Sequence, residues 1–170
     1  MQHCYRTKET AEACLEELST EDKNRCIEKL NLHVQSDVIL EDGFVERYFG
    51  RLDGDKLYTY AYVWPVDVFD VTHKAFDVES VAGVCARTGE AIQRIDNSPL
   101  HSGSDGDVIV VVSHADTLQI LQTYAAGLQN VGKFSQYRFN NGEVRALKQT
   151  PDSLPPPVAL KVPKPGEFAP

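Results

Sequence analysis

The sequence lacks the features that mark several protein classes. It has no apolar run long enough to span a bilayer, and its N-terminus has no signal-peptide core. Acidic residues outnumber basic ones by 25 to 17, a formal net charge of -8, which argues against a general surface for nucleic acid or anionic lipid. A small anionic substrate needs positive charge only locally. We therefore expect a cytoplasmic protein with no membrane and no nucleic-acid partner.

Cysteine is also sparse, and its four positions form no motif. Cysteines stand at 4, 14, 26 and 85, without a Cys-x-x-Cys pair and without histidines at metal-ligand spacing. This pattern is typical of reduced, partly buried thiols in a cytosolic protein. We expect neither a metal nor a cofactor.

The chain is long enough for one domain with a real core. It has 170 residues, of which 42% are hydrophobic and 25% are charged. From Thr150 onward, prolines are too dense for a packed element, and no Pro-x-x-Pro spacing marks an SH3 ligand. We predict a domain over residues 1–149 and a disordered, proline-rich tail over 150–170.

One stretch, Asp107 to Gly127, organises the rest of the chain. It opens with five consecutive apolar residues, Val108 to Val112, which predict a strand that is covered on both faces in a parallel sheet. Apolar residues at helical spacing follow. Asp116 or Thr117 is the expected N-cap, and Gly127 is the expected C-terminal glycine.

Ser113 and His114 stand between this strand and this helix. Open α/β sheets bind anions at such junctions, because the free N–H groups and the helix dipole favour negative charge. The stretch therefore predicts a phosphate or carboxylate site that contains a histidine. The other histidines lie in polar or irregular surroundings and are interpreted as surface residues: His3, His33, His73 and His101.

Hydrophobic spacing predicts the remaining elements. Helices are expected over 7–18, 19–30 and, most clearly, 77–95, and a weak strand over 32–40. Residues 41–54 are mostly loop. Residues 56–69 suit either a strand or a helix, because their tyrosines alternate while their apolar residues also share one helical face. A hairpin is expected around Asn140-Asn141-Gly142.

Four segments, taken in order, resemble motifs of the histidine phosphatase superfamily, which has the phosphoglycerate mutase-like fold. They are YRTKETAEACLEEL, in which an arginine precedes Thr-Ala by four residues, FVERYFGRLDG, VIVVVSHADTLQIL and the hairpin NNGEVRAL. The resemblance covers roughly residues 5 to 148. It implies a three-layer α/β/α fold and phosphoryl transfer on a phosphomonoester through a phosphohistidine, without a metal.

The resemblance also implies roles for individual residues. Glu46 becomes the proton donor and His114 the second histidine, both catalytic. Arg6 becomes the phosphate clamp, because a guanidinium offers a fixed fork of donors to phosphate oxygens. Arg47 and Ser113 are added as substrate phosphate ligands, although Arg47 could instead pair with one of the many acids.

The motif of the family's nucleophile, Arg-His-Gly, occurs nowhere in the 170 residues. We therefore expect the fold without its first strand and the helix after it, and a domain that is incomplete at its N-terminus. Either the chain is a truncated copy of an active phosphatase, or it is an inactive remnant that binds an anion or a protein partner. Loss of the first strand would expose an edge of the Val108–Val112 strand and permit self-association.

A smaller departure follows His114. The family commonly has glycine there, whereas this chain has Ala115-Asp116. The Asp116 carboxylate can cap the helix, but its charge would oppose a nearby phosphate. Neither the substrate nor the choice between mutase and phosphatase follows from these motifs.

Overall fold

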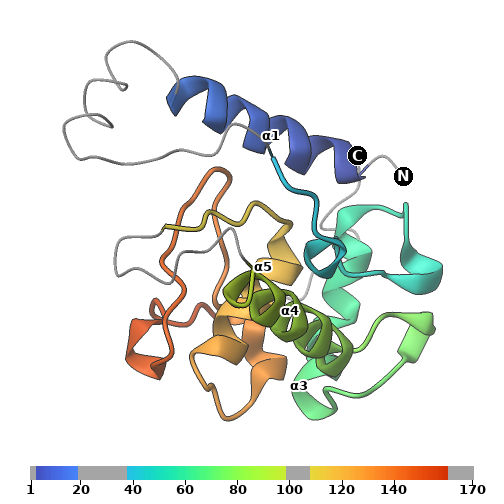
Figure 1. Ribbon diagram of the computed structural model, residues 1–170. Helices are drawn as coiled ribbons and strands as arrows, with labels where there is room; N and C mark the ends of the chain where they lie inside the picture. The colour runs from blue at the N-terminus through green and yellow to red at the C-terminus, as the bar shows by residue number, and fades with distance from the viewer. Residues whose placement is uncertain (1–2, 19–37, 99–107, 161–170) are drawn as a thin grey trace.

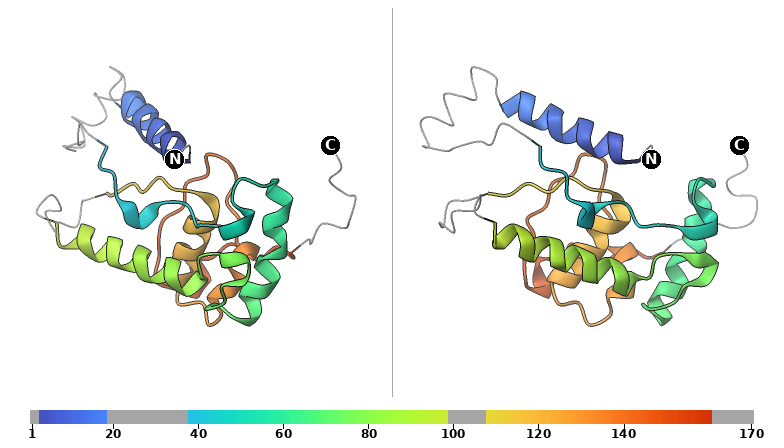
Figure 2. Two further views of the ribbon diagram at one scale, coloured as in Figure 1. Left: turned by 90° about the vertical axis from the view of Figure 1, so that its right-hand side faces the viewer. Right: turned by 45° about the vertical axis from the view of Figure 1, so that its right-hand side comes forward.

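The computed structural model of the protein describes residues 3–18, 38–98 and 108–160 (Figures 1 and 2). Within these ranges the regular structure is helical, and no strand is formed. The α-helices are α1 (His3–Leu18), α3 (Trp64–Phe69), α4 (Val81–Asp96) and α5 (Ala115–Ala125). Short 3₁₀ segments are η1 (Asp42–Phe44), η2 (Gly50–Leu52), η3 (Leu57–Tyr62), η4 (Ala75–Asp77), η5 (Val131–Gln136) and η6 (Pro151–Ser153). None of the helices in the described ranges is long and apolar enough to cross a membrane.

Helix α1 confirms the helix predicted over residues 7–18 and begins earlier, at His3. It lies along one side of the other helices in all views (Figures 1 and 2). Its predicted apolar face is not buried: Cys14 is exposed, and Ala11 and Leu15 are only half-buried. The predicted helix over 19–30 and most of the predicted strand over 32–40 lie outside the described residues.

Helix α4 confirms the clearest helix of the sequence, with a later start than residue 77. The Ser80 hydroxyl accepts a hydrogen bond of 3.1 Å from the Gly83 N–H, so Ser80 is the N-cap. Asp77 has a φ of 61°, a left-handed conformation that cannot continue a helix. The buried face consists of residues at helical spacing: Val81, Val84, Cys85, Thr88 and Ala91.

Helix α5 confirms the helix predicted after His114, including its C-terminus. Gly127 has a φ of 69°, and its N–H donates to the Tyr124 carbonyl at 3.0 Å. The Leu128 N–H donates to the Thr123 carbonyl at 3.0 Å, which completes a Schellman motif. The predicted N-caps are wrong. His114 occupies the cap position and makes no side-chain capping bond.

Helices α4 and α5 pack against each other and form the centre of the core (Figure 1). Val81 and Val84 of α4 meet Ile120 of α5 and Phe134 of η5, and all four are fully buried. Burial of such side chains stabilises the fold by about 1.5–3 kcal/mol each. A second cluster joins Phe44, Ala91 and Leu121, and thereby fastens η1 onto the same helix pair.

The predicted strand Val108–Val112 is not formed among the described residues. This segment makes no backbone hydrogen bond with another described segment, and Val108 and Val110 are 83% and 68% exposed. A run of apolar residues shows that a strand could be buried there. A strand also needs a neighbouring strand, which supplies the donors and acceptors for its backbone hydrogen bonds. The three-layer fold, and the sheet edge expected to permit self-association, are therefore not seen in the described ranges.

The ambiguous segment 56–69 is helical. It forms η3 and then α3, with Pro65 in the first turn of α3, where its missing N–H costs nothing. The Tyr60 ring stacks on the Phe49 ring with centroids 3.9 Å apart. Of the alternating tyrosines, Tyr60 therefore packs against the preceding loop, while Tyr62 is 44% exposed.

The predicted turn after Phe139 is present, although no strands flank it in the described chain. The Glu143 N–H donates to the Asn140 carbonyl at 3.1 Å, and Gly142 has a φ of 71°. Beyond Thr150, η6 forms, and the Val158 N–H donates to the Gln136 carbonyl at 2.8 Å. Residues 150–160 thus run against the domain.

Candidate active site

Glu46 and His114 lie side by side, although they are far apart in the sequence. The Oε2 atom of Glu46 is 3.5 Å from the Nδ1 atom of His114. Both side chains are largely buried, with 29% and 13% of their surface exposed. The pair therefore places a carboxyl and an imidazole together at the N-terminus of α5, with part of each group open to solvent.

Two hydroxyl groups hold the Glu46 loop against α5. The Ser113 hydroxyl donates to the Phe44 carbonyl at 2.5 Å, and the Thr117 hydroxyl donates to the Val45 carbonyl at 2.9 Å. These bonds fix the two residues that precede Glu46. Ser113, which was expected to bind phosphate, thus donates its proton to the protein.

The surroundings of Glu46 suit a proton donor. Burial raises the pKa of its carboxyl to about 7, and the negative charge of Asp116 adds to this rise. The Arg47 N–H, which donates to Oε1 at 3.0 Å, and the charges of Arg87 and Arg47 lower the pKa in part. A carboxyl with such a pKa is protonated in a large fraction of molecules near neutral pH and can give up its proton there.

Arg47 is turned into the core. Its side chain is fully buried, its Nε donates to the Glu79 carbonyl at 2.8 Å, and Nη1 and Nη2 donate to the two carboxylate oxygens of Asp67 at 2.8 and 2.7 Å. The structure thus realises the second of the two roles that the sequence left open for Arg47, pairing with an acid.

Asp116 is also directed inward. Its Oδ2 accepts a hydrogen bond of 3.0 Å from the Trp64 indole and lies 3.9 Å from Nη1 of Arg47. Burial raises the pKa of Asp116 to about 6, while Arg47 and Trp64 lower it in part. The sequence predicts that the charge of this carboxylate opposes a nearby phosphate. The structure places it on the core side of the pair.

Arg87 of α4 is a residue that the sequence analysis did not single out. Its Nε and Nη2 bind the two carboxylate oxygens of Glu79 at 2.7 and 3.0 Å, and its Nη1 donates to the Gly43 carbonyl at 2.7 Å. Its positive charge lowers the pKa of Glu46. Its helical position alone carried no signal of this role, because Arg87 belongs to no motif.

The prediction that His73 is a surface residue is wrong. Its side chain is only 7% exposed, and its Nε2 atom lies 2.7 Å from Oδ1 of Asp67. The backbone of Arg6 belongs to α1, but its side chain lies outside the described residues. The relation of Arg6 to Glu46 and His114 therefore stays a prediction.

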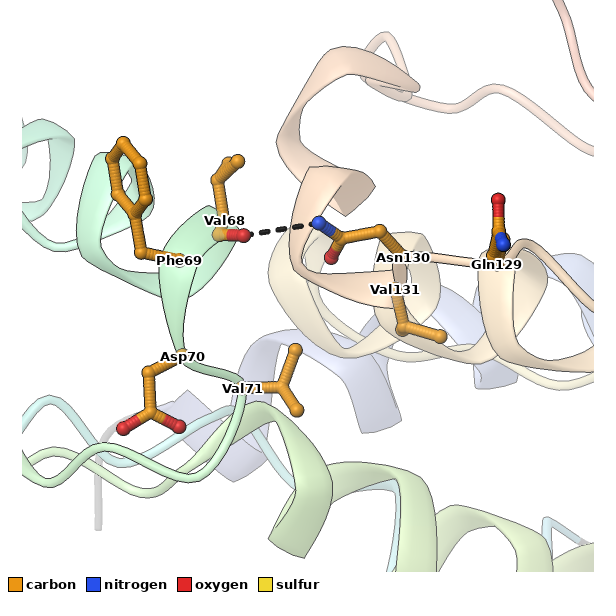
Figure 3. Close-up of a pocket in the computed structure, with 7 residues that line it drawn as sticks. All are labelled: Val68, Phe69, Asp70, Val71, Gln129, Asn130 and Val131. Atoms are coloured by element: carbon orange, nitrogen blue, oxygen red, sulfur yellow. Dashed lines mark hydrogen bonds between the residues drawn. The ribbon is translucent and has the colours of Figure 1, made fainter.

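A surface pocket of about 370 Å³ lies elsewhere, between the end of α3 and the chain that leads from α5 into η5 (Figure 3). The Asn130 side chain crosses it and donates to the Val68 carbonyl at 3.0 Å. Its one acid, Asp70, already accepts bonds from the Thr72 N–H and hydroxyl. This pocket contains no acid–histidine pair.

Within the ranges that the structure describes, no three His, Cys, Asp or Glu side chains are grouped to hold a metal ion.

Comparison with known proteins gives one result. The sequence profile described as "Histidine phosphatase superfamily (branch 1)" matches residues 4–155, a span that includes Arg6, Glu46, Arg47, Ser113 and His114. Searches of curated proteins and of solved structures give no match.

Proposed function

This chain belongs to branch 1 of the histidine phosphatase superfamily, and on that premise we propose that Glu46 and His114 form one side of a site for a phosphomonoester. The family implies the phosphoglycerate mutase-like α/β fold and phosphatase or mutase chemistry. The observation that carries the proposal is the distance of 3.5 Å between the Glu46 carboxyl and the His114 imidazole, at the start of a helix.

In the proposed reaction, a nucleophilic histidine nitrogen attacks the phosphorus atom, and the bond from phosphorus to the ester oxygen breaks. Glu46 gives its proton to the departing oxygen, so that an alcohol leaves instead of an alkoxide. His114 donates a hydrogen bond to the phosphoryl oxygens, where negative charge spreads in the transition state. Water then attacks the phosphohistidine, the Glu46 carboxylate accepts its proton, and inorganic phosphate is released.

We propose further that the nucleophile is not among these 170 residues. The Arg-His-Gly motif does not occur in the sequence. His73 is occupied, because Nε2 contacts Asp67 and Nδ1 accepts a hydrogen bond of 3.1 Å from the Ala75 N–H. By this proposal the chain as written binds phosphate without turning over an ester, and an Arg-His-Gly segment supplied in frame would restore turnover.

Phosphate binding and turnover test the two parts separately. Titration calorimetry of the 170-residue protein with inorganic phosphate should give saturable binding, which His114→Ala weakens about tenfold or more. Asp70→Asn is a matched control, because Asp70 lies in the other pocket. Absence of saturable binding would refute the site.

With p-nitrophenyl phosphate we expect no hydrolysis above the His114→Ala level, and hydrolysis that depends on His114 would show that the nucleophile is present.

A second candidate function is the binding of a protein partner by an inactive remnant. Exposed apolar side chains favour it: Ile39, Leu40, Val108, Val110 and Val144 are all at least 60% exposed. Exposed apolar side chains mark an interaction surface where they form a contiguous patch. Where the partner is a second copy of this chain, sedimentation velocity over a hundredfold concentration range should show self-association, which Val108→Glu with Val110→Lys removes. If the partner contact uses the proline-rich tail instead, deletion of residues 151–170 removes it.

A further inference from the structure

The ion pair between Arg47 and Asp67 lies directly behind the candidate site. The Arg47 guanidinium donates hydrogen bonds to both carboxylate oxygens of Asp67, at 2.8 and 2.7 Å, and both side chains are excluded from solvent. Removal of two charges from water is costly, and apolar side chains of similar volume are often as stable in such a place. A buried pair is therefore better explained by the geometry that it imposes than by stability.

Arg47 touches the site through its backbone. Its N–H donates to Oε1 of Glu46 at 3.0 Å, while Oε2 of the same carboxyl faces Nδ1 of His114 at 3.5 Å. The two oxygens of Glu46 are thus fixed by two different partners. The orientation of the carboxyl depends on where the backbone of residue 47 is held.

The side chain of Arg47 holds that backbone. Its Nε is bound to the Glu79 carbonyl, and its two terminal nitrogens are bound to Asp67. The rings of Phe49 and Phe134 lie 5.5 and 5.7 Å from the guanidinium carbon. A planar guanidinium with three acceptors and two aromatic neighbours has little freedom to move, so the chain at residue 47 is anchored.

Asp67 is itself oriented from a second direction. Nε2 of His73 lies 2.7 Å from Oδ1 of Asp67, and Nδ1 accepts the Ala75 N–H. Because Nδ1 acts as an acceptor, the proton is assigned to Nε2, which donates to Asp67. The carboxylate therefore has a fixed direction that does not depend on Arg47 alone.

We propose that Asp67 is a positioning residue of the phosphoryl-transfer site: it binds the Arg47 guanidinium, and the Arg47 amide in turn holds the Glu46 carboxyl against His114. This inference rests on the proposed function, because the direction of Glu46 matters only if Glu46 is the proton donor. It gives Arg47 a role inside the protein and not as a ligand of the substrate.

The experiment removes the whole pair in the 170-residue protein, by Arg47→Met with Asp67→Leu, so that neither partner remains as an unpaired buried charge. Asp116 loses the guanidinium at 3.9 Å but keeps the hydrogen bond from the Trp64 indole. The carboxyl carbon of Glu46 is followed by ¹³C NMR as a function of pH. The charged groups that act on Glu46 are His114, Asp116, Arg87 and Arg47 itself. We expect the titration midpoint to fall from about 7 in the wild type to within one unit of the ordinary value of 4.5.

Two electrostatic effects accompany the loss of Arg47. Loss of its positive charge raises the pKa of Glu46 directly, but it also favours neutral Asp116, which then no longer raises the pKa of Glu46. Arg47→Lys keeps the positive charge, so a fall of the Glu46 midpoint in that variant as well reports release of the carboxyl into water. A folded double variant with a Glu46 midpoint of 7 or above would overturn the proposal. If the double variant does not fold, Arg47→Lys decides, because lysine keeps the charge but not the fork. A folded Arg47→Lys protein with the wild-type midpoint would overturn the proposal too.

A matched control uses an ion pair that is away from the site. Arg51 and Asp77 lie 3.0 Å apart and are both more than 70% exposed, so Arg51→Gln with Asp77→Asn should leave the Glu46 midpoint unchanged. A shift in this control equal to that of the buried double variant would count against a specific role for Asp67. Calorimetry with inorganic phosphate separates the proposed function from the positioning role of Asp67. A wild-type protein that binds no phosphate refutes the proposed function, whereas the effect of the Arg47–Asp67 pair on the Glu46 midpoint is measured independently of phosphate.

Discussion

The indole Nε1 of Trp64 donates a hydrogen bond of 3.0 Å to the carboxylate of Asp116, two residues after His114. Trp64 is the only tryptophan of the chain, so its fluorescence reports on this one carboxyl. The guanidinium of Arg138 lies over the same indole, 4.9 Å from the ring centroid. The core side of the site therefore contains a natural optical probe.

Trp64 fluorescence should titrate with Asp116. Burial raises the pKa of Asp116 to about 6, and its protonation removes a negative charge from the indole N–H. We expect the emission maximum or intensity to change with a midpoint near pH 6 while the protein stays folded by circular dichroism. Asp116→Asn should abolish this transition. A wild-type transition that persists in Asp116→Asn would assign it to another group.

Stability should depend on pH through the same carboxyl. A folded-state pKa that is raised from 3.8 to about 6 means that the folded protein favours neutral Asp116. This contribution is complete below pH 4 and is lost as the pH rises through 6. Between pH 4 and 8, Asp116→Asn should therefore gain on the order of 2 kcal/mol of unfolding free energy relative to the wild type. Urea denaturation at both pH values measures the difference, and a pH-independent difference would contradict it.

The Thr117 hydroxyl should matter for phosphate binding more than for stability. Thr117→Val leaves the Val45 carbonyl without its donor and loosens the Glu46 loop, at a cost of about 1 kcal/mol in stability. Thr123→Val is the matched control, since Thr123 lies on the same helix, is equally buried and donates only to carbonyls of its own helix. Calorimetry should show weaker phosphate binding for Thr117→Val alone. Equal weakening by both variants would point to a general effect on α5.

Two glycine substitutions should differ sharply in cost. At Gly132, an added Cβ would lie 2.0 Å from the carbonyl oxygen of Asp67, so Gly132→Ala must push η5 away from α3. At Gly127 no atom lies within 4 Å of such a Cβ, and only the positive φ opposes alanine. We expect about 1 kcal/mol for Gly127→Ala and at least ~3 kcal/mol for Gly132→Ala. Thermal and urea denaturation compare them, and similar losses would contradict this packing.

The sequence predicted the elements whose pattern is local. Helices α4 and α5 carry apolar residues at helical spacing over three turns or more, so their existence and the glycine at residue 127 could be predicted correctly. The Val108–Val112 strand could not, because a strand is defined by a partner elsewhere in the chain. The local pattern of residues 56–69 likewise suited both a strand and a helix, and in the folded protein Tyr60 of this segment stacks on Phe49.

The same limit applies to the site. The motif that contains Glu46 and the junction that contains His114 drew attention to those two residues, and the structure brings them together. Nothing local marks Asp67, which stands in an aromatic segment, or links it to Arg47 and His73. The contact of Asp67 with Arg47 forms only when α3 meets the Glu46 loop, so no spacing rule could find it.

The contacts of the Arg47 guanidinium with three different elements have a consequence for folding. Its guanidinium is bound by Asp67 of α3 and by the backbone of Glu79 before α4, and it lies near Asp116 of α5. Separation of any of these elements would leave an unpaired charge in an apolar interior. Partial opening is therefore disfavoured, and α3, α4 and α5 separate together. Hydrogen exchange at Nε of Arg47 should therefore proceed only through global unfolding, at a rate set by the total stability of the domain.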